Sequence, residues 1–190
     1  SSAASEEYKG HVAKQAGIPE ARKIKLNGNV NPYGASLKAS EALANIPLHV
    51  YPDPLQRNVR GALAKYTGME PENLIAGAGS DELIDLLFRL FVSPGESVLD
   101  FDPTFGMYKF CAAIAGAEVK SVPRDEDFEI DIGEAKRALD AGTKMILVNS
   151  PNNPTGNPAT EEQFRALLDT GRIVVIDEAY YEFCGETAAG

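Results

Sequence analysis

Hydrophobic and polar positions follow two alternating periods from about residue 56 onward. Stretches with apolar residues at helical spacing are followed by short apolar or β-branched runs, and this order repeats as far as residue 177. The predicted helices span 56–67, 81–92, 104–115, 132–141 and 160–170, and the predicted strands span 74–76, 97–101, 118–122, 145–149 and 172–177. This alternation predicts a three-layer α/β/α domain with a mostly parallel sheet.

The segment 81–92 illustrates the helical pattern, because its apolar residues form one stripe and its charged residues lie elsewhere. Ser80 is a suitable cap residue before this helix, and Pro94 with Gly95 is predicted to end it. The segment 172–177 reads R-I-V-V-I-D, a continuous β-branched run that is typical of a strand buried on both faces.

The segment 26–54 differs from the rest, since it is rich in proline, glycine and asparagine. This composition predicts an irregular arm before the sheet. We therefore expect an N-terminal arm and irregular segment over 1–50, and the sheet domain over 51–190. Residues 1–10 lack the apolar run of a secretory signal peptide.

Composition narrows the choice of partners. The chain has 190 residues, 18 Lys and Arg against 28 Asp and Glu, a formal charge of −10 and 44% hydrophobic residues, as expected of a soluble globular protein. The negative charge argues against binding to nucleic acid or to an anionic membrane. Two cysteines and two histidines without metal-ligand spacing predict reduced thiols and no metal site.

Ligands of open α/β sheets bind at the carboxyl ends of the strands, so we looked for unusual residues there. The first candidate is G-A-G-S-D-E at 77–82, a glycine turn whose amides and helix dipole suit a phosphate. Two alternatives remain open from these residues. The turn could be purely structural, or it could bind a dinucleotide, although Glu82 stands where G-x-G-x-x-G requires its third glycine.

Two further candidates follow the last two predicted strands. In S-P-N-N-P-T-G, 150–156, two prolines fix the amides of Asn152 and Asn153 for contact with a polar ligand; a plain loop is the alternative. In D-E-A-Y-Y-E-F, 177–183, a carboxylate ends a buried strand and needs a cationic or hydrogen-bonding partner. Alternatively, Asp177 only caps a helix.

Six motifs in this order resemble the fold type I aminotransferases that use pyridoxal phosphate, and within them the histidinol-phosphate aminotransferase family. They are N-V-N-P-Y-G (29–34), Y-P-D-P (51–54), G-S-D-E-L-I-D-L-L-F-R (79–89), P-T-F-G-M-Y (103–108), S-P-N-N-P-T-G and D-E-A-Y-Y-E-F. The resemblance implies transamination of L-histidinol phosphate with 2-oxoglutarate, which yields glutamate, and a protein of the bacterial cytoplasm or the plastid stroma.

The resemblance also assigns roles to residues that would bind pyridoxal 5'-phosphate. The turn at Gly79 would hold its phosphate through the backbone amides of Ser80 and Asp81. Phe105 would stack on the ring, where relatives often have tyrosine. The catalytic candidates are residues that contact polar atoms of the ring: Asn153 and Tyr180 at the phenolic oxygen, and Asp177 at the pyridine nitrogen.

Residues of the arm would complete the site. Tyr51 matches a tyrosine that reaches the cofactor phosphate of a neighbouring subunit, so the resemblance implies a homodimer. Asn31 and Tyr33 match substrate-side positions, and Val30 replaces the glutamate that is usual in relatives. The family segment with the Schiff-base lysine has no match up to Gly190, so we expect this chain to be the N-terminal part of a longer enzyme. Another aminotransferase, a threonine-phosphate decarboxylase-like enzyme and a non-catalytic phosphate-binding fragment remain alternatives.

Overall fold

The computed structural model describes Gly17 and residues 28–188 of the chain. The chain divides into two compact units, Ser1–Leu55 and Gln56–Gly190. In the described part of the first unit, α2 spans Leu37–Ala44. The prediction that 26–54 is irregular was wrong for this segment, because L-K-A-S-E-A-L-A is rich in strong helix formers.

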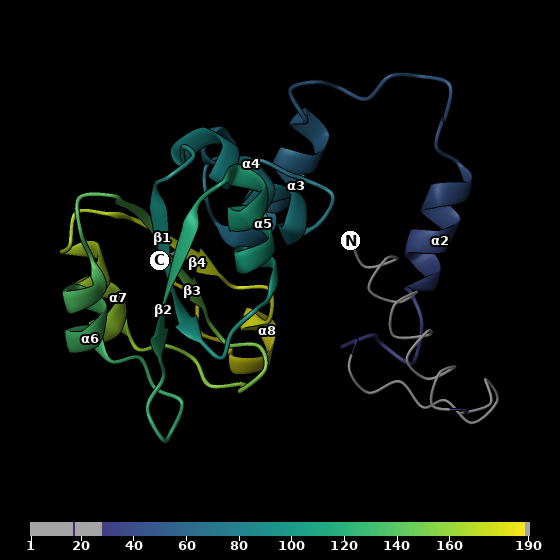
Figure 1. Cartoon of the computed structure of the whole chain (residues 1–190). Coiled ribbons are helices and arrows are strands. Elements are labelled where there is room, and N and C mark those ends of the chain that lie inside the picture. The colour runs from purple at the N-terminus through teal and green to yellow at the C-terminus, as the bar shows by residue number, and fades with distance from the viewer. Residues whose placement is uncertain (1–16, 18–27, 189–190) are drawn as a thin grey trace. The chain divides into compact units, whose positions relative to one another are not determined.

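The second unit contains a four-stranded parallel sheet in the order β2-β1-β3-β4 (Figure 1). Its strands are β1 (Ser97–Asp102), β2 (Glu118–Pro123), β3 (Thr143–Asn149) and β4 (Ile173–Asp177). The register pairs Asp100 with Ser121 and Asn149 with Asp177. The ends of β3 and β4 therefore lie side by side, which positions the residues described below.

Helices cover both faces of this sheet. The helices of the second unit are α3 (Arg57–Thr67), the 3-10 helix η2 (Pro71–Asn73), α4 (Ser80–Phe91), α5 (Met107–Ala115), α6 (Ile132–Ala138), α7 (Glu161–Leu168) and α8 (Tyr181–Cys184). Helices α4 and α5 pack on one face, and α6 and α7 on the other (Figure 1). This arrangement confirms the predicted three-layer α/β/α fold.

The buried core lies on both sides of β1 and β3. Alternate strand residues point to opposite faces, so Val98 packs with α4 and α5, whereas Leu99 packs with α6 and α7. In β3, Leu147 and Val148 divide in the same way. Both central strands are therefore covered on both faces, which explains their continuous apolar sequences.

The predicted strand at 74–76 was wrong, since none of its residues joins the sheet. The side chain of Gln56 instead bonds the backbone of Ala76, donating to its carbonyl at 2.8 Å and accepting from its amide at 2.9 Å. Ser80 is also not the cap of its helix; Gly79 is the N-cap residue and Ser80 the first helical residue.

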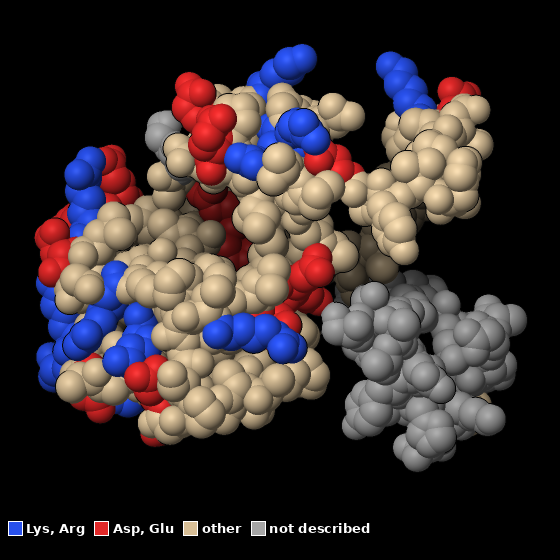
Figure 2. Space-filling model, turned by 90° about the horizontal axis from the view of Figure 1, so that it is seen from above, with Lys and Arg blue, Asp and Glu red and all other residues tan. Residues whose placement is uncertain are grey.

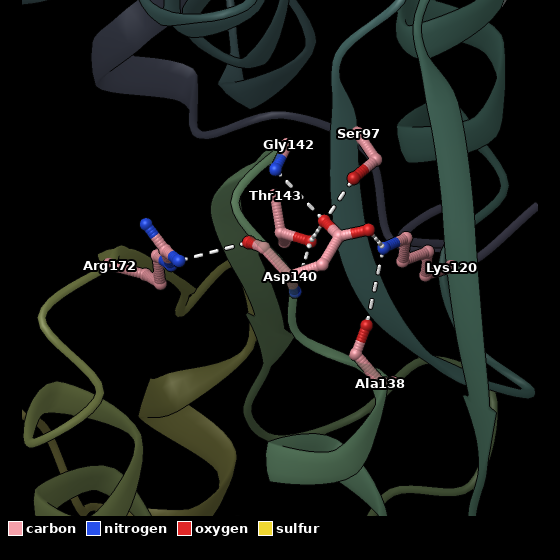
Figure 3. A network of polar contacts seen from close by, with 7 residues as sticks. All are labelled: Ser97, Lys120, Ala138, Asp140, Gly142, Thr143 and Arg172. Atoms are coloured by element: carbon pink, nitrogen blue, oxygen red, sulfur yellow. Dashed lines mark hydrogen bonds and ion pairs between the residues drawn. The ribbon is translucent and has the colours of Figure 1, made fainter.

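A polar network ties the strands together at their amino ends (Figure 3). The Asp140 carboxylate lies 2.5 Å from the Lys120 ammonium of β2 and accepts from the Thr143 hydroxyl of β3 at 3.0 Å. Arg172, just before β4, donates to the Asp140 carbonyl at 2.9 Å. Ser97 at the start of β1 shares a hydrogen bond of 3.1 Å with Thr143. This edge of the sheet is thus fixed by side chains from all four strand regions.

Within residues 28–188 and at Gly17, no helix is long and apolar enough to cross a membrane. The same residues contain no group of three or more histidine, cysteine or acidic side chains placed to hold a metal ion. Cys111 and Cys184 are both free thiols.

Candidate functional site

A pocket lies at the carboxyl ends of β3 and β4, at the opposite edge of the sheet from the network around Asp140. It is lined by Ser80, Phe105, Asn149, Asn153, Asp177, Ala179 and Tyr180. Five of these residues were singled out from the sequence, and they come from four separate segments of the chain. The structure therefore brings the glycine turn and the loops after three strands to one place, as the carboxyl-end rule predicts.

The carboxylate of Asp177 is a buried acidic group in the pocket, and both of its oxygens accept hydrogen bonds. The Asp177 residue is 9% exposed, and its Oδ2 accepts a 2.9 Å hydrogen bond from the Tyr108 hydroxyl. Its Oδ1 accepts from the amide of Ala179 at 3.2 Å. Because a carboxylate offers about four acceptor sites, these two bonds leave it able to accept another donor from the pocket. A cationic N–H donor would meet this requirement best.

Tyr108 is buried beneath the pocket and remains a hydrogen-bond donor. Burial, and secondarily the Asp177 carboxylate, raise the pKa of the Tyr108 phenol far above its usual value. The same side chain meets Phe105 edge to face, with ring centroids 5.8 Å apart and an interplanar angle of 86°. Tyr108 thus contacts both the aromatic wall of the pocket and its carboxylate.

Two buried asparagines connect the loops of the pocket by hydrogen bonds. Asn149 donates to the backbone carbonyl of Asp177 at 3.0 Å and accepts from the amide of Asn153 at 2.5 Å. Asn152 donates to the carbonyl of Pro103 and accepts from the hydroxyl of Thr104, both at 3.0 Å. The loops that carry Phe105, Asn153 and Asp177 are therefore linked to one another directly.

The contacts of Asn152 also explain a difference from the sequence analysis. Helix α5 begins at Met107, not at 104 as predicted. Residues 103 and 104 make hydrogen bonds to Asn152 instead of starting a helical turn, and Phe105 remains in the loop as a wall of the pocket.

The glycine turn leads from the outside of the pocket into α4. Gly79 has φ 81° and ψ 177°, a conformation that is essentially restricted to glycine. The Glu82 carboxylate turns back and accepts from the amide of Ala78 at 2.5 Å, which holds the turn. Ser80 then lines the pocket at the first position of the helix, and Asp81 follows it in the first turn of α4.

The three arm residues singled out from the sequence belong to the first unit. Asn31 forms a local turn, accepting from the amide of Tyr33 at 3.0 Å and donating to the carbonyl of Gly34 at 3.1 Å. The side chains of Tyr33 and Tyr51 are highly exposed, with 94% and 97% of their surface accessible. All residues that line the pocket belong to the second unit.

The sequence analysis missed Asn149 and Tyr108. Asn149 is a polar residue at the end of an apolar strand, which is the signal that drew attention to Asp177, so it could have been found. Tyr108 lies within a recognised motif, but its partner is 69 residues away in the sequence. Only the packing of α5 against the sheet brings the two together.

Charge is distributed without one dominant sign on the face shown in Figure 2. Lysine and arginine side chains stand beside aspartate and glutamate side chains, with uncharged areas between them. On this face, the mixture forms no broad basic area that would attract a polyanion.

Comparison with known proteins gives a consistent result. The family model "Aminotransferase class I and II" matches residues 21–189. A histidinol-phosphate aminotransferase of Dehalococcoides mccartyi is 48% identical over 167 residues, covering 87% of this chain and 47% of the relative. The chloroplastic histidinol-phosphate aminotransferase 1 of Arabidopsis thaliana is 44% identical over 164 residues, covering 85% of this chain and 39% of the relative.

Solved structures show the same fold. The histidinol-phosphate aminotransferase of Sinorhizobium meliloti, solved in complex with pyridoxal-5'-phosphate, superposes with a TM-score of 0.76 at 24% identity. The match covers 90% of this chain and 47% of that protein. The chain thus spans about half the length, or less, of the curated relatives it matches.

Proposed function

This chain belongs to the class I and II aminotransferase family, and from that premise we propose that it forms the cofactor-binding part of a histidinol-phosphate aminotransferase. The proposed reaction transfers an amino group between L-histidinol phosphate and 2-oxoglutarate, with pyridoxal 5'-phosphate as cofactor. The observation that carries the proposal is the pocket, in which Ser80, Phe105, Asn153, Asp177 and Tyr180 line one space. The names of relatives at 43–48% identity support the choice of substrate.

The chemistry of the pocket fits the cofactor. A protonated pyridine nitrogen would satisfy the remaining acceptor capacity of the Asp177 carboxylate, which is 9% exposed and accepts one hydrogen bond on each oxygen. Phe105 offers an aromatic face beside it, and the side chains of Asn153 and Tyr180 supply polar atoms for an oxygen substituent. The amides at Ser80 and Asp81 would hold the phosphate at the start of α4.

Each of these residues has a definite task in the proposed reaction. When bound, the cofactor supplies an electron sink for the negative charge that develops at the substrate α-carbon. Asp177 keeps a proton on the ring nitrogen, and Tyr180 with Asn153 orients the ring through its oxygen substituent. Phe105 excludes water from one face of the site. Because the chain spans about half of its relatives, catalysis is proposed for a whole protein of their length.

Cofactor binding can be tested on the 190-residue chain itself. Titration with pyridoxal 5'-phosphate, followed by absorbance, should give saturable binding. Asp177→Asn should weaken it by about tenfold or more, because a hydrogen bond to a charged group is lost. Asp169→Asn is the matched control, since Asp169 is exposed at the end of α7 and should bind normally. Equal binding by all three chains would contradict the proposed site.

Substrate choice is tested on the whole protein. Glutamate formation from 2-oxoglutarate should be fastest with L-histidinol phosphate and much slower with aspartate, alanine or phenylalanine as the amino donor. A preference for one of these amino acids would show that it, and not histidinol phosphate, is the amino donor. Release of carbon dioxide from threonine phosphate would indicate a decarboxylase.

We also propose that the whole protein is a homodimer in which Tyr51 reaches the cofactor phosphate of the neighbouring subunit. The support is the Y-P-D-P motif together with the exposure of the Tyr51 side chain. Bacterial relatives and relatives named chloroplastic support a bacterial cytoplasm or a plastid as its compartment.

A further inference from the structure

Tyr108 lies outside the group of residues assigned to the cofactor, yet it contacts two of them. Its residue is 1% exposed, so its hydroxyl has no access to bulk water and needs a partner inside the protein. That partner is Asp177 Oδ2, at 2.9 Å. Its ring meets the ring of Phe105 edge to face.

This arrangement has a direct chemical effect on Asp177. A hydrogen bond donated to a carboxylate stabilises the charged form over the protonated form. The second donor, the Ala179 amide, is longer at 3.2 Å, so the Tyr108 hydroxyl is the closer of the two. Removing it leaves a carboxylate that is 9% exposed with one protein donor fewer.

We propose that Tyr108 is a positioning residue, which holds the Asp177 carboxylate aimed at the ring nitrogen of the cofactor while its own ring supports Phe105. This inference rests on the proposed function, since it presumes that a pyridine nitrogen binds at Asp177. One buried side chain then fixes the position of the Phe105 ring relative to the Asp177 carboxylate.

Other charged and titratable groups surround this pair. Asp100 of β1 is fully buried, and its charge favours the neutral Tyr108 phenol, as does that of Asp177. Arg124, which follows β2, has the opposite effect, because its positive charge lowers the pKa of the Tyr108 phenol. Tyr180 lines the pocket beside Asp177. Asp100 and Arg124 are present in every variant below, and the comparison of Tyr108→Phe with the unmodified chain changes only the Tyr108 hydroxyl.

The test measures how binding of pyridoxamine 5'-phosphate is lost on acidification. This probe carries the pyridine nitrogen and the phosphate but forms no Schiff base with stray lysines. The pairing proposed here joins a carboxylate to the protonated ring nitrogen, so affinity for the probe should fall on acidification. In Tyr108→Phe the midpoint of this loss should rise by about one pH unit, which corresponds to about 1.4 kcal/mol.

Controls separate this effect from general destabilisation. Tyr66→Phe removes another hydroxyl that donates to a carboxylate, that of Glu182 at 2.8 Å, outside the residues that line the pocket. It should leave the midpoint unchanged. Protonation of the probe's own phosphate affects all chains equally. When Asp177→Asn is introduced as well, the chains with tyrosine and with phenylalanine at residue 108 should have the same midpoint.

If Tyr108→Phe does not fold, as judged by circular dichroism, a second route is open. Replacement of tyrosine by 3-fluorotyrosine in the Tyr180→Phe chain keeps the ring at 108 and makes its hydroxyl a stronger donor. The midpoint should then move to lower pH than in the unfluorinated Tyr180→Phe chain.

The outcomes are distinguishable. A midpoint that rises in Tyr108→Phe, or falls with fluorotyrosine, supports the positioning role. Binding with the same midpoint in all chains overturns that role and leaves the cofactor site standing. No binding of the probe by the unmodified chain at any pH overturns the proposed function and this inference with it.

Discussion

Gly79 sets the conformation of the turn that leads into α4. Its φ of 81° and ψ of 177° fall in a region that other residues essentially do not occupy. A Cβ added there would meet no atom within 4 Å, so the demand for glycine comes from the backbone and not from packing. The phosphate-binding geometry proposed for Ser80 therefore depends on glycine at this position.

We predict that Gly79→Ala lowers the free energy of unfolding by about 1–3 kcal/mol and weakens binding of pyridoxamine 5'-phosphate. Urea denaturation and ligand titration measure the two effects. Gly68→Ala is a matched control, since Gly68 also has a positive φ, 76°, and open space around its Cβ position. It should cost stability without changing affinity. An unchanged affinity in Gly79→Ala would contradict the role of this turn.

At the scale of elements, local pattern was enough to predict most of the sheet unit and too little to predict how its loops are held. The helices of the two layers and the four strands were predicted from the spacing of apolar residues, which form stripes in the helices and short apolar or alternating runs in the strands. The prediction of a strand at 74–76 was wrong because the side chain of Gln56, 20 residues away, hydrogen-bonds to both the amide and the carbonyl of Ala76. The predicted start of α5 at residue 104 was wrong because the Thr104 hydroxyl donates a hydrogen bond to Asn152, 48 residues away.

The site shows the same division. Motifs indicated five of the residues that line the pocket, whereas the hydrogen bonds that hold these residues in place depend on tertiary contacts. Asn149 bonds to Asp177 across 28 residues and Tyr108 across 69, distances over which no sequence period carries information. The motifs thus indicated five residues that line the pocket, whereas the contact between Tyr108 and Asp177 could not be predicted from them.

The network at the amino ends of the strands gives a prediction for acid stability (Figure 3). The Lys120 ammonium, and then the Thr143 hydroxyl, lower the pKa of Asp140 from 3.8 to about 2. A carboxyl whose pKa is depressed in the folded state stabilises that state above its unfolded pKa. This contribution should therefore be present above about pH 4 and be lost as the pH falls towards 2.

Urea denaturation at pH 5 and at pH 2.5 checks this expectation. The unmodified chain should lose more stability between the two values than Asp140→Asn, whose residue 140 does not titrate. Lys120→Met should reduce the loss as well, because it removes the main cause of the depressed pKa. An identical loss in all three chains would show that Asp140 has an ordinary pKa.

At the scale of the whole molecule, each proposed active site is built from two copies of the protein. Tyr51 belongs to the first unit and Asp177 to the second, and the proposal assigns Tyr51 to the site of the neighbouring subunit. In whole protein, Tyr51→Ala and Asp177→Ala should each be strongly impaired. A mixed dimer of the two has one site with both defects and one site with neither.

Refolding the two variants together should therefore restore activity to about a quarter of the normal sites, if subunits mix at random. The assay is glutamate formation with L-histidinol phosphate as the donor. Each variant refolded alone provides the baseline. Activity that stays at this baseline in the mixture would indicate that Tyr51 acts within its own subunit.

The most direct test of the central claim is a map of the bound cofactor on this chain. In ¹H–¹⁵N spectra recorded during titration with pyridoxamine 5'-phosphate, the largest shifts should fall on the amides of residues that line the pocket: Ser80, Phe105, Asn153, Asp177 and Tyr180. Saturating shifts confined to these residues and their neighbours would support the proposed site. Shifts that cluster elsewhere, or none at saturating ligand, would contradict it.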